Sequence, residues 1–220
     1  MMPLHVGFLC LLYALHRTLR CTSARYFILH TLMNAWVVWN VFDDACATLA
    51  RPTSTYPTGP MVIYHVLVFH LYHWACYRTS VDERVHHVVN VFVVCPLLLT
   101  RPSNLVHLAF FFMCGLPGCV TYATLSLQKL GYVSRTAEKR VSKHINLWIR
   151  APGVVVTCYL IGLNHVSRAL DPAANLAALL VLLASLWNGM YFLSAIVVSE
   201  YQCRATCEPV VDARERKNVP

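Results

Sequence analysis

The sequence predicts an all-α, polytopic membrane protein of about seven transmembrane helices, with its N-terminus outside and its C-terminus in the cytoplasm. Three observations predict this fold class. The chain is much more apolar than a soluble domain, its apolar residues fall into seven segments, and its positive charges collect in alternate connections between those segments.

The composition of the 220 residues limits the class of protein. Hydrophobic residues make up 57% of the chain and charged residues 13%, whereas a soluble domain carries about 25% charged residues. So few charged side chains cover a soluble fold poorly. The composition therefore disfavours a soluble enzyme, a disordered chain and a secreted disulfide scaffold, and the mean hydropathy of +0.52 agrees with this.

The apolar segments can be read in order along the chain. A helix needs about 20 mainly apolar residues to cross the hydrocarbon core of a bilayer, and shorter segments rely on interfacial residues or local thinning. The candidate spans are residues 4–16, 26–42, 61–77, 85–99, 104–127, 151–163 (with a start as early as 145) and 173–198. They form one membrane domain, residues 1–203, which is followed by a polar cytoplasmic tail, residues 204–220.

Two interpretations of the first, short segment stay open. A signal peptide has a basic region before its apolar stretch and small residues at a cleavage site, and this segment has neither. Arg17, Arg20 and Arg25 follow it, and such charges favour a retained helix with its N-terminus outside.

The formal net charge of +8 has a topological explanation. Fifteen of the 18 Lys and Arg residues lie in the first, third and fifth connections and in the tail; only Arg51, Arg101 and Arg168 lie in the others. Positive residues collect on the cytoplasmic side of membrane proteins. The excess therefore indicates topology and not a nucleic-acid site. Arg150, at the entry of the sixth span, is expected to lie at the membrane interface or to snorkel toward it.

The fifth span contains a break, Gly115-Leu116-Pro117-Gly118. Proline removes a backbone hydrogen bond, and a gap at membrane depth is tolerated where protein or a cavity satisfies the freed groups. We therefore keep two interpretations, a packing kink between closely approaching helices and the wall of a cavity.

Histidines provide the main functional indication. His70 and His73 share a face near the end of the third span, and His86 and His87 open the fourth. A short link makes these two spans a hairpin, so the four imidazoles are expected at similar depth. His30 and Asn34 enter from the same side, and Asn90 follows one turn after the His86-His87 pair. Ionisable groups inside a bilayer tend to face the bundle interior, to pair or to carry function.

Three hypotheses can account for this cluster. The first is a histidine-metal lipid hydroxylase or desaturase, although the ligand-rich histidine boxes of such enzymes are missing. The second is acyl transfer, with a histidine as general base. The third is structural: interfacial histidines that bond to neighbouring helices or lipid headgroups.

The segment Arg78-Thr-Ser-Val-Asp82-Glu-Arg-Val-His86-His87 resembles the central motif of the TLC domain, over about residues 25–204. That family includes ceramide synthases and non-catalytic lipid-associated proteins. The resemblance implies a helical barrel around a lipid cavity, endoplasmic reticulum residence, and His86 and His87 at the position of the paired catalytic histidines.

One departure from the ceramide synthase pattern shapes the functional prediction. The acidic residues that follow the paired histidines in those enzymes have no counterpart, since no Asp or Glu occurs between Val85 and Thr136. We therefore predict a non-catalytic protein that binds membrane lipids, without cofactor, metal or nucleic acid. The alternative is an N-acyltransferase that uses acyl-CoA as co-substrate. The candidate residues are His86 and His87 for catalysis and His30, Asn34, His70, His73, Asn90, Gly115, Pro117 and Gly118 for the lipid cavity.

Overall fold

A computed structural model describes residues 2–19, 22–78, 80–166 and 172–215, without side chains for 2–5, 22, 165–166, 172–178 and 207–215. Arg20, Thr79, Arg168, Arg216 and Lys217, which the sequence prediction uses, lie outside the described residues. The described chain is all-helical and contains seven helices. Three are single elements near the N-terminus: α1 (Met2–Thr18), α2 (Thr22–Ala50) and α3 (Met61–Cys76).

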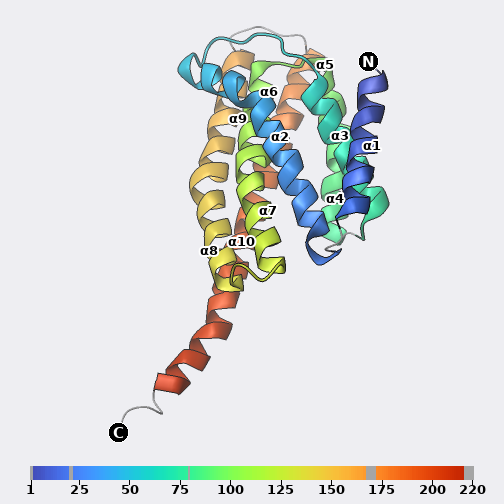
Figure 1. Cartoon of the computed structure of the whole chain (residues 1–220). Coiled ribbons are helices and arrows are strands. Elements are labelled where there is room, and N and C mark those ends of the chain that lie inside the picture. The colour runs from blue at the N-terminus through green and yellow to red at the C-terminus, as the bar shows by residue number, and fades with distance from the viewer. Residues whose placement is uncertain (1, 20–21, 79, 167–171, 216–220) are drawn as a thin grey trace.

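The next three helices each contain a central π-helical turn. The fourth consists of α4 (Val81–Val89), η1 (Asn90–Val94) and α5 (Cys95–Thr100), and the fifth of α6 (Asn104–Phe110), η2 (Phe111–Gly115) and α7 (Leu116–Lys129). The sixth consists of α8 (Arg135–Ile145), η3 (Asn146–Arg150) and α9 (Ala151–Val166). The last, α10 (Pro172–Glu215), continues beyond the bundle into the predicted tail (Figure 1).

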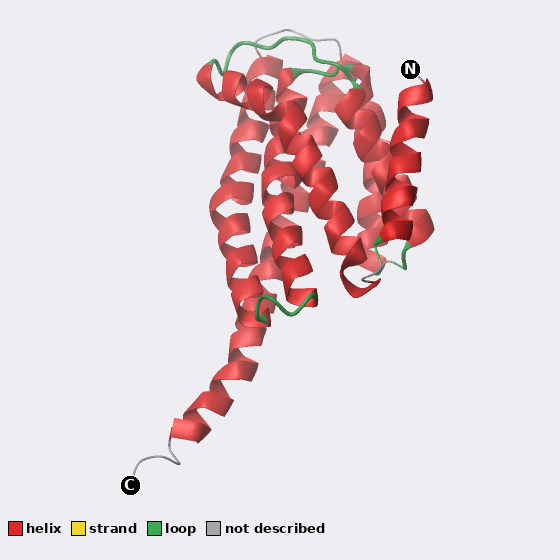
Figure 2. Ribbon diagram, viewed as in Figure 1, coloured by secondary structure: helices red, strands yellow, loops and turns green. Residues whose placement is uncertain are grey.

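The all-helical fold class is confirmed, and four helices are long and apolar enough to cross a membrane: Val81–Thr100, Asn104–Lys129, Arg135–Asn164 and Leu179–Thr206. Val6–Thr18 and Met61–Cys76 are shorter apolar helices. The chain reverses at the two ends of the bundle in turn, as the green connections show (Figure 2). We call the end that holds the α3–α4 and α7–α8 connections, where most basic connections were predicted, the basic end.

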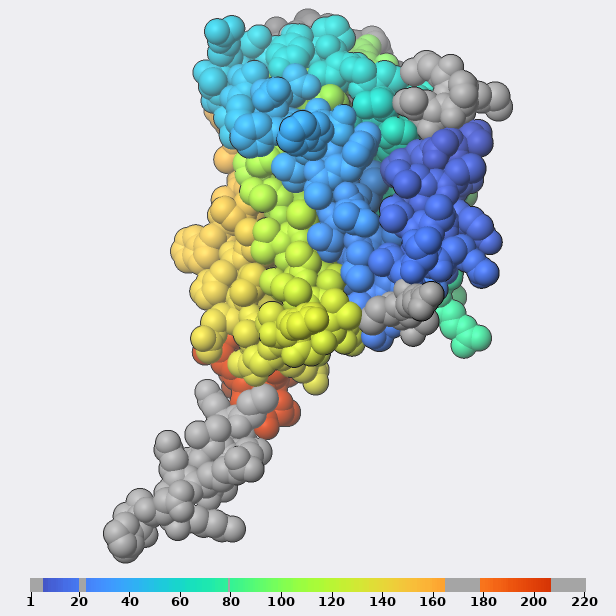
Figure 3. All heavy atoms as spheres, viewed as in Figure 1, coloured from blue at the N-terminus to red at the C-terminus, as the bar shows by residue number. Residues whose placement is uncertain are grey.

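Six of the seven helices form a closed ring. Around it, α2 contacts α6 and α7, which contact α8 and α9, and α10 joins these to α5. The hairpin of α3 with α4 and α5 then returns to α2. The remaining helix, α1, lies outside the ring against α2 and α3, so that α1, α2 and α7 lie side by side on one face (Figure 3).

The three π turns have a common cause in the sequence. At the end of each turn a backbone N–H bonds to the carbonyl five residues earlier: Cys95 to Asn90, Leu116 to Phe111, and Ala151 to Asn146. The next residue is in every case a proline: Pro96, Pro117 and Pro152. A proline lacks the N–H and its ring clashes with the carbonyl four residues back, and the wider π turn accommodates both effects. The prolines therefore do not end these helices.

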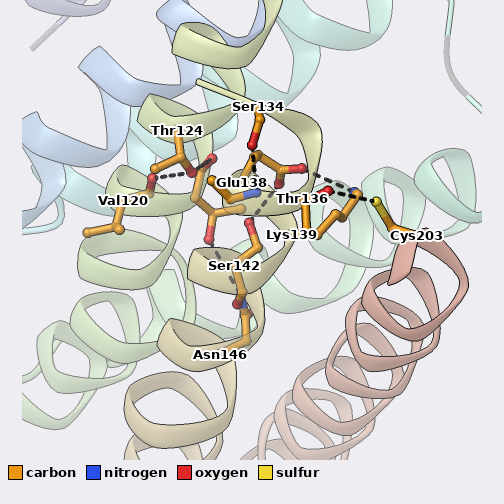
Figure 4. Close-up of polar contacts among 11 residues, drawn as sticks. Val120, Thr124, Ser134, Thr136, Glu138, Lys139, Ser142, Asn146 and Cys203 are labelled. Carbon is orange, nitrogen blue, oxygen red and sulfur yellow. Dashed lines mark hydrogen bonds and ion pairs between the residues drawn. The ribbon is translucent and has the colours of Figure 1, made fainter. Parts of the chain in front are cut away.

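Polar contacts lie within α8 and between α8 and α10 at the basic end. The buried Glu138 carboxylate accepts a hydrogen bond from Ser142 Oγ at 2.8 Å and lies 3.5 Å from Lys139 Nζ (Figure 4). Glu200 of α10 pairs with Lys143 Nζ of α8 at 3.2 Å and with Arg204. Each of these carboxylates has a cationic partner, as burial of a charge requires.

A second polar cluster lies at the opposite end of the bundle. Asp44 of α2 accepts hydrogen bonds from His107 Nδ1 of α6 at 2.6 Å and from the Tyr56 hydroxyl in the α2–α3 connection at 2.7 Å. Asn104, which is fully buried, donates to Thr48 Oγ1 and to the Ser54 carbonyl, at 2.9 Å each. These bonds fix the connection onto the start of α6.

Candidate functional site

The ring encloses a cavity of about 230 Å³. This volume lies just below the usual range of about 300–1,000 Å³ for ligand pockets, so it suits one small amphiphile or one portion of a larger lipid. Its walls are mainly apolar and come from all six ring helices, while α1 contributes nothing described to them. Among the residues that line it are Met33, Val37, Val66, Val94, Leu98, Phe110, Met113 and Val181.

The structure brings the five predicted histidines of the basic end together. We refer to His30, His70, His73, His86 and His87 as the histidine cluster. The ring centre of His70 lies 5.6 Å from that of His86 and 5.4 Å from that of His87, and the ring centre of His30 lies 4.8 Å from that of His73. The short α3–α4 link produces this convergence, because it places the end of one helix beside the start of the next.

One pair in this cluster shares a buried hydrogen bond. His73 Nδ1 and His87 Nε2 lie 2.8 Å apart, and both side chains are almost completely buried. A neutral imidazole carries one N–H and one lone pair. One of the two rings therefore donates in this bond and the other accepts. Of the two outer nitrogens, His73 Nε2 and His87 Nδ1, one then carries a proton and the other a lone pair. Both outer nitrogens are buried without a hydrogen-bond partner among the described residues.

Two asparagine side chains contact the His86 ring. Its Nδ1 lies 3.0 Å from Asn188 Oδ1 of α10, and an amide oxygen only accepts. When Nδ1 donates to Asn188 Oδ1, Nε2 keeps its lone pair; the Asn90 amide nitrogen lies 3.1 Å from Nδ1 and 3.4 Å from Nε2. Asn90 donates to the His86 carbonyl at 2.8 Å and lies against the same ring. In the tautomer with the proton on Nδ1, Nε2 of His86, which lines the cavity, can accept a proton, as a general base does.

The other predicted site residues divide into two groups. Asn34 and Gly118 line the cavity together with His30, His70, His87 and Asn90. A Cβ atom on Gly118 would lie 2.5 Å from Asn34 Nδ2, so glycine allows α2 and α7 to approach here. His73, Gly115 and Pro117 do not line the cavity. Gly115 packs on Val37 and Val38, and Pro117 is fully buried, so this part of the predicted cavity wall is a packing contact between helices.

Arg150 lies in the middle of the sixth helix and not at its start. It lies 15 positions after Arg135 in one continuous helix, about 22 Å along the axis at about 1.5 Å per residue, and it lines the cavity. The sixth helix begins before the predicted span, because the amphipathic segment α8 continues without interruption through η3 into α9.

Several cavity residues lie beyond what the sequence indicated. Tyr26 and Tyr122 frame His30, with ring centres 4.3 and 4.4 Å from its own. Glu83 lines the cavity as well, and its carboxylate accepts from the Ser80 backbone N–H at 2.8 Å in a capping box. The Ser80-x-x-Glu83 pattern could have predicted the capping box. Tyr122 and Asn188 carry no local signal, because their roles depend on contacts between distant helices.

No group of three or more His, Cys, Asp or Glu residues within the described chain is arranged to hold a metal ion. Comparisons of the whole chain with protein-family models, with curated proteins and with solved structures each gave no match. The resemblance to the TLC domain therefore stays a prediction, and the case for function rests on the cavity.

Proposed function

We propose that this chain is an integral membrane protein that binds lipid in the cavity of its six-helix ring, without catalysing a reaction. The observation that carries the proposal is the cavity itself, which combines apolar walls with four members of the histidine cluster, His30, His70, His86 and His87. A ring of helices around such a cavity is also what a TLC-like protein would need. We further propose that all seven helices cross the membrane, with the basic end in the cytoplasm, and that the protein resides in the endoplasmic reticulum.

Filling the cavity is expected to remove the bound lipid. Val94 lines the cavity, whereas its neighbour Val93 is 41% exposed on the outer surface of the same π turn. We expect Val94→Trp to lose co-purifying lipid because the indole occupies the cavity, and Val93→Trp to retain it. The measurement is native mass spectrometry of the protein purified in a mild detergent, followed by lipid extraction. Equal lipid content in both variants, or no bound lipid in the wild type, would contradict the proposal.

The geometry of His86 supports a second candidate function, acyl transfer from acyl-CoA to an amine. In that reaction the amine nitrogen attacks the thioester carbonyl, His86 Nε2 accepts the amine proton, and the proton then passes to the departing CoA thiolate. The Asn188 contact orients the ring. No carboxylate is hydrogen-bonded to His86 or His87 within the described chain, which is why this candidate ranks second.

An acyl-transfer assay distinguishes the two functions. The purified chain, reconstituted in vesicles, is supplied with a long-chain acyl-CoA and a sphingoid base, and the N-acyl product is measured. If the protein is an acyltransferase, His86→Ala is expected to lower the rate by a factor of about 100 or more, the usual contribution of a general base. His144→Ala provides the matched control, because His144 is exposed at the end of α8. A wild type without product formation would reject this candidate and leave lipid binding unaffected.

A further inference from the structure

Arg150 is a cation inside the helical ring without a partner. It forms no hydrogen bond or ion pair with any described residue, and its Nε atom is buried without an acceptor. It nevertheless lines the cavity. Other partly buried cations have a carboxylate partner, as Lys143 has in Glu200. Arg150 is therefore an exception to the charge pairing of the bundle.

An unpaired arginine at this depth is unfavourable for the empty protein. A charge in a low-dielectric interior loses its hydration, and burial is tolerated when another group compensates the charge. The ionisable groups that interact with its guanidinium are Tyr122, Cys114 and His86, a phenol, a thiol and an imidazole, none of which is an anion at neutral pH. The one carboxylate among the cavity-lining residues, Glu83, is held in its capping box with Ser80. The protein itself thus supplies no counter-charge.

We propose that Arg150 binds the anionic headgroup of an amphiphile, a carboxylate or a phosphate monoester, whose apolar part occupies the cavity. This inference rests on the proposed function and names the class of lipid. A guanidinium presents its donors in a planar fork that matches two oxygens of a carboxylate or phosphate. The surrounding walls are apolar, with Met113 and Val37 in the lining, so that a free inorganic anion would leave most of the cavity surface without a partner.

The depth of Arg150 selects against a neutral ligand. Its backbone lies about 22 Å along the helix from the start of α8, and its Nε atom is buried, so that its charge is screened weakly. An anion that reaches it forms a desolvated charge pair. A neutral alcohol or glyceride of the same chain length would fill the same apolar volume and leave the guanidinium uncompensated. The site should therefore discriminate by headgroup charge and not by chain length.

The test compares three amphiphiles that share one alkyl chain. The full chain, in a non-ionic detergent, is titrated with palmitate, hexadecyl phosphate and hexadecanol, and with inorganic phosphate alone, and binding is followed by native mass spectrometry. We expect the wild type to bind palmitate or hexadecyl phosphate at least about tenfold more tightly than hexadecanol. Hexadecanol lacks the anionic partner of Arg150, and the loss of one partner of a buried charge pair lowers affinity by at least this factor. Arg150→Gln is expected to bind all three amphiphiles equally.

Two further variants provide controls. Arg150→Lys keeps the charge and is expected to retain part of the preference, and Arg140→Gln removes an exposed charge on the same helix and is expected to behave as the wild type. The melting temperature of unliganded Arg150→Gln should equal or exceed that of the wild type, because an uncompensated buried charge has been removed.

The outcomes separate the two proposals. A wild type that binds hexadecanol as tightly as palmitate and hexadecyl phosphate, or an Arg150→Gln variant that keeps the anion preference, would overturn the role of Arg150 while lipid binding stands. Inorganic phosphate that binds as tightly as hexadecyl phosphate would identify a free anion as the ligand and overturn the headgroup assignment. Failure of all three amphiphiles to bind the wild type would overturn the proposed function itself.

Discussion

Replacing Gly153 with alanine is expected to destabilise the folded protein by about 2 kcal/mol. A Cβ atom at this position would lie 2.8 Å from Phe112 Cβ and closer still to the phenyl ring. The Cβ atom of Phe112 is fixed to the backbone of η2, so α9 and η2 must move apart. Overpacking of this kind costs about 3 kcal/mol, of which the better helix propensity of alanine offsets about 1 kcal/mol.

The same helix contains a matched control. A Cβ atom on Gly162 would meet only Leu182 Cδ1, at 4.0 Å, which is an ordinary contact. Gly162→Ala should therefore be neutral or stabilising by up to about 1 kcal/mol. The comparison uses reversible unfolding of the purified variants in mixed micelles. Combining Gly153→Ala with Phe112→Ala should recover part of the lost stability, since the ring is removed. A Gly153→Ala variant as stable as Gly162→Ala would show that α9 and η2 are not in close contact.

Removing the Asp44 carboxylate is expected to have a similarly large effect at the other end of the bundle. Asp44→Ala leaves His107 Nδ1 buried without an acceptor and frees the Tyr56 hydroxyl. Hydrogen bonds to a charged group contribute about 1.5–3 kcal/mol each, and the carboxylate is 27% exposed, so we expect a net loss of about 2 kcal/mol of unfolding free energy. Asp43→Ala is the control, because Asp43 is exposed and forms no described bond; it should stay within about 0.5 kcal/mol of the wild type.

A titration provides an independent measurement of the same contact. The hydrogen bond to Asp44 raises the pKa of Tyr56 to about 12, because the nearby carboxylate favours the protonated phenol. Since this pKa lies above the ordinary value of about 10, the contact contributes its full stability below about pH 10 and loses it as the pH rises toward 12. In a tyrosinate absorbance titration, the difference between the wild type and Tyr56→Phe should have its midpoint near pH 12. In the Asp44→Ala background that midpoint should fall toward 10; an unchanged midpoint would contradict the contact.

Much of the fold could be predicted from local sequence features. Seven apolar segments predicted seven helices, and the short link between Cys76 and Val81 predicted the hairpin that brings His70 and His73 to His86 and His87. These features depend on residues close together in the chain. The capping box at Ser80 and the three prolines were also visible in the sequence.

The remaining features depend on how distant helices are rotated against one another. Arg150 was expected at the interface because it borders an apolar run, but its direction into the cavity depends on the π turn that it ends. Asn188 approaches His86 from a helix 102 positions away in the chain. Gly115 and Gly118 are three residues apart, yet only Gly118 lines the cavity. The periodicity of apolar residues identifies a helix. Which side of that helix faces the cavity depends on its rotation about its own axis, and the π turns change this rotation.

Each π turn acts as a one-residue insertion in a regular α-helix. An inserted residue rotates the side chains before it by about 100° about the helix axis relative to the side chains after it. Three of the six helices of the ring therefore consist of two segments whose faces are rotated against each other. Deleting a single residue within η3 would remove the extra residue of the turn, bring the Pro152 ring back against the carbonyl four residues earlier, and rotate Lys143 of α8 away from Glu200 if α9 kept its place. In this protein the number of residues in each π turn therefore sets the relative rotation of the two helical segments that flank it. Homologous chains should be aligned on these turns before their cavity residues are compared.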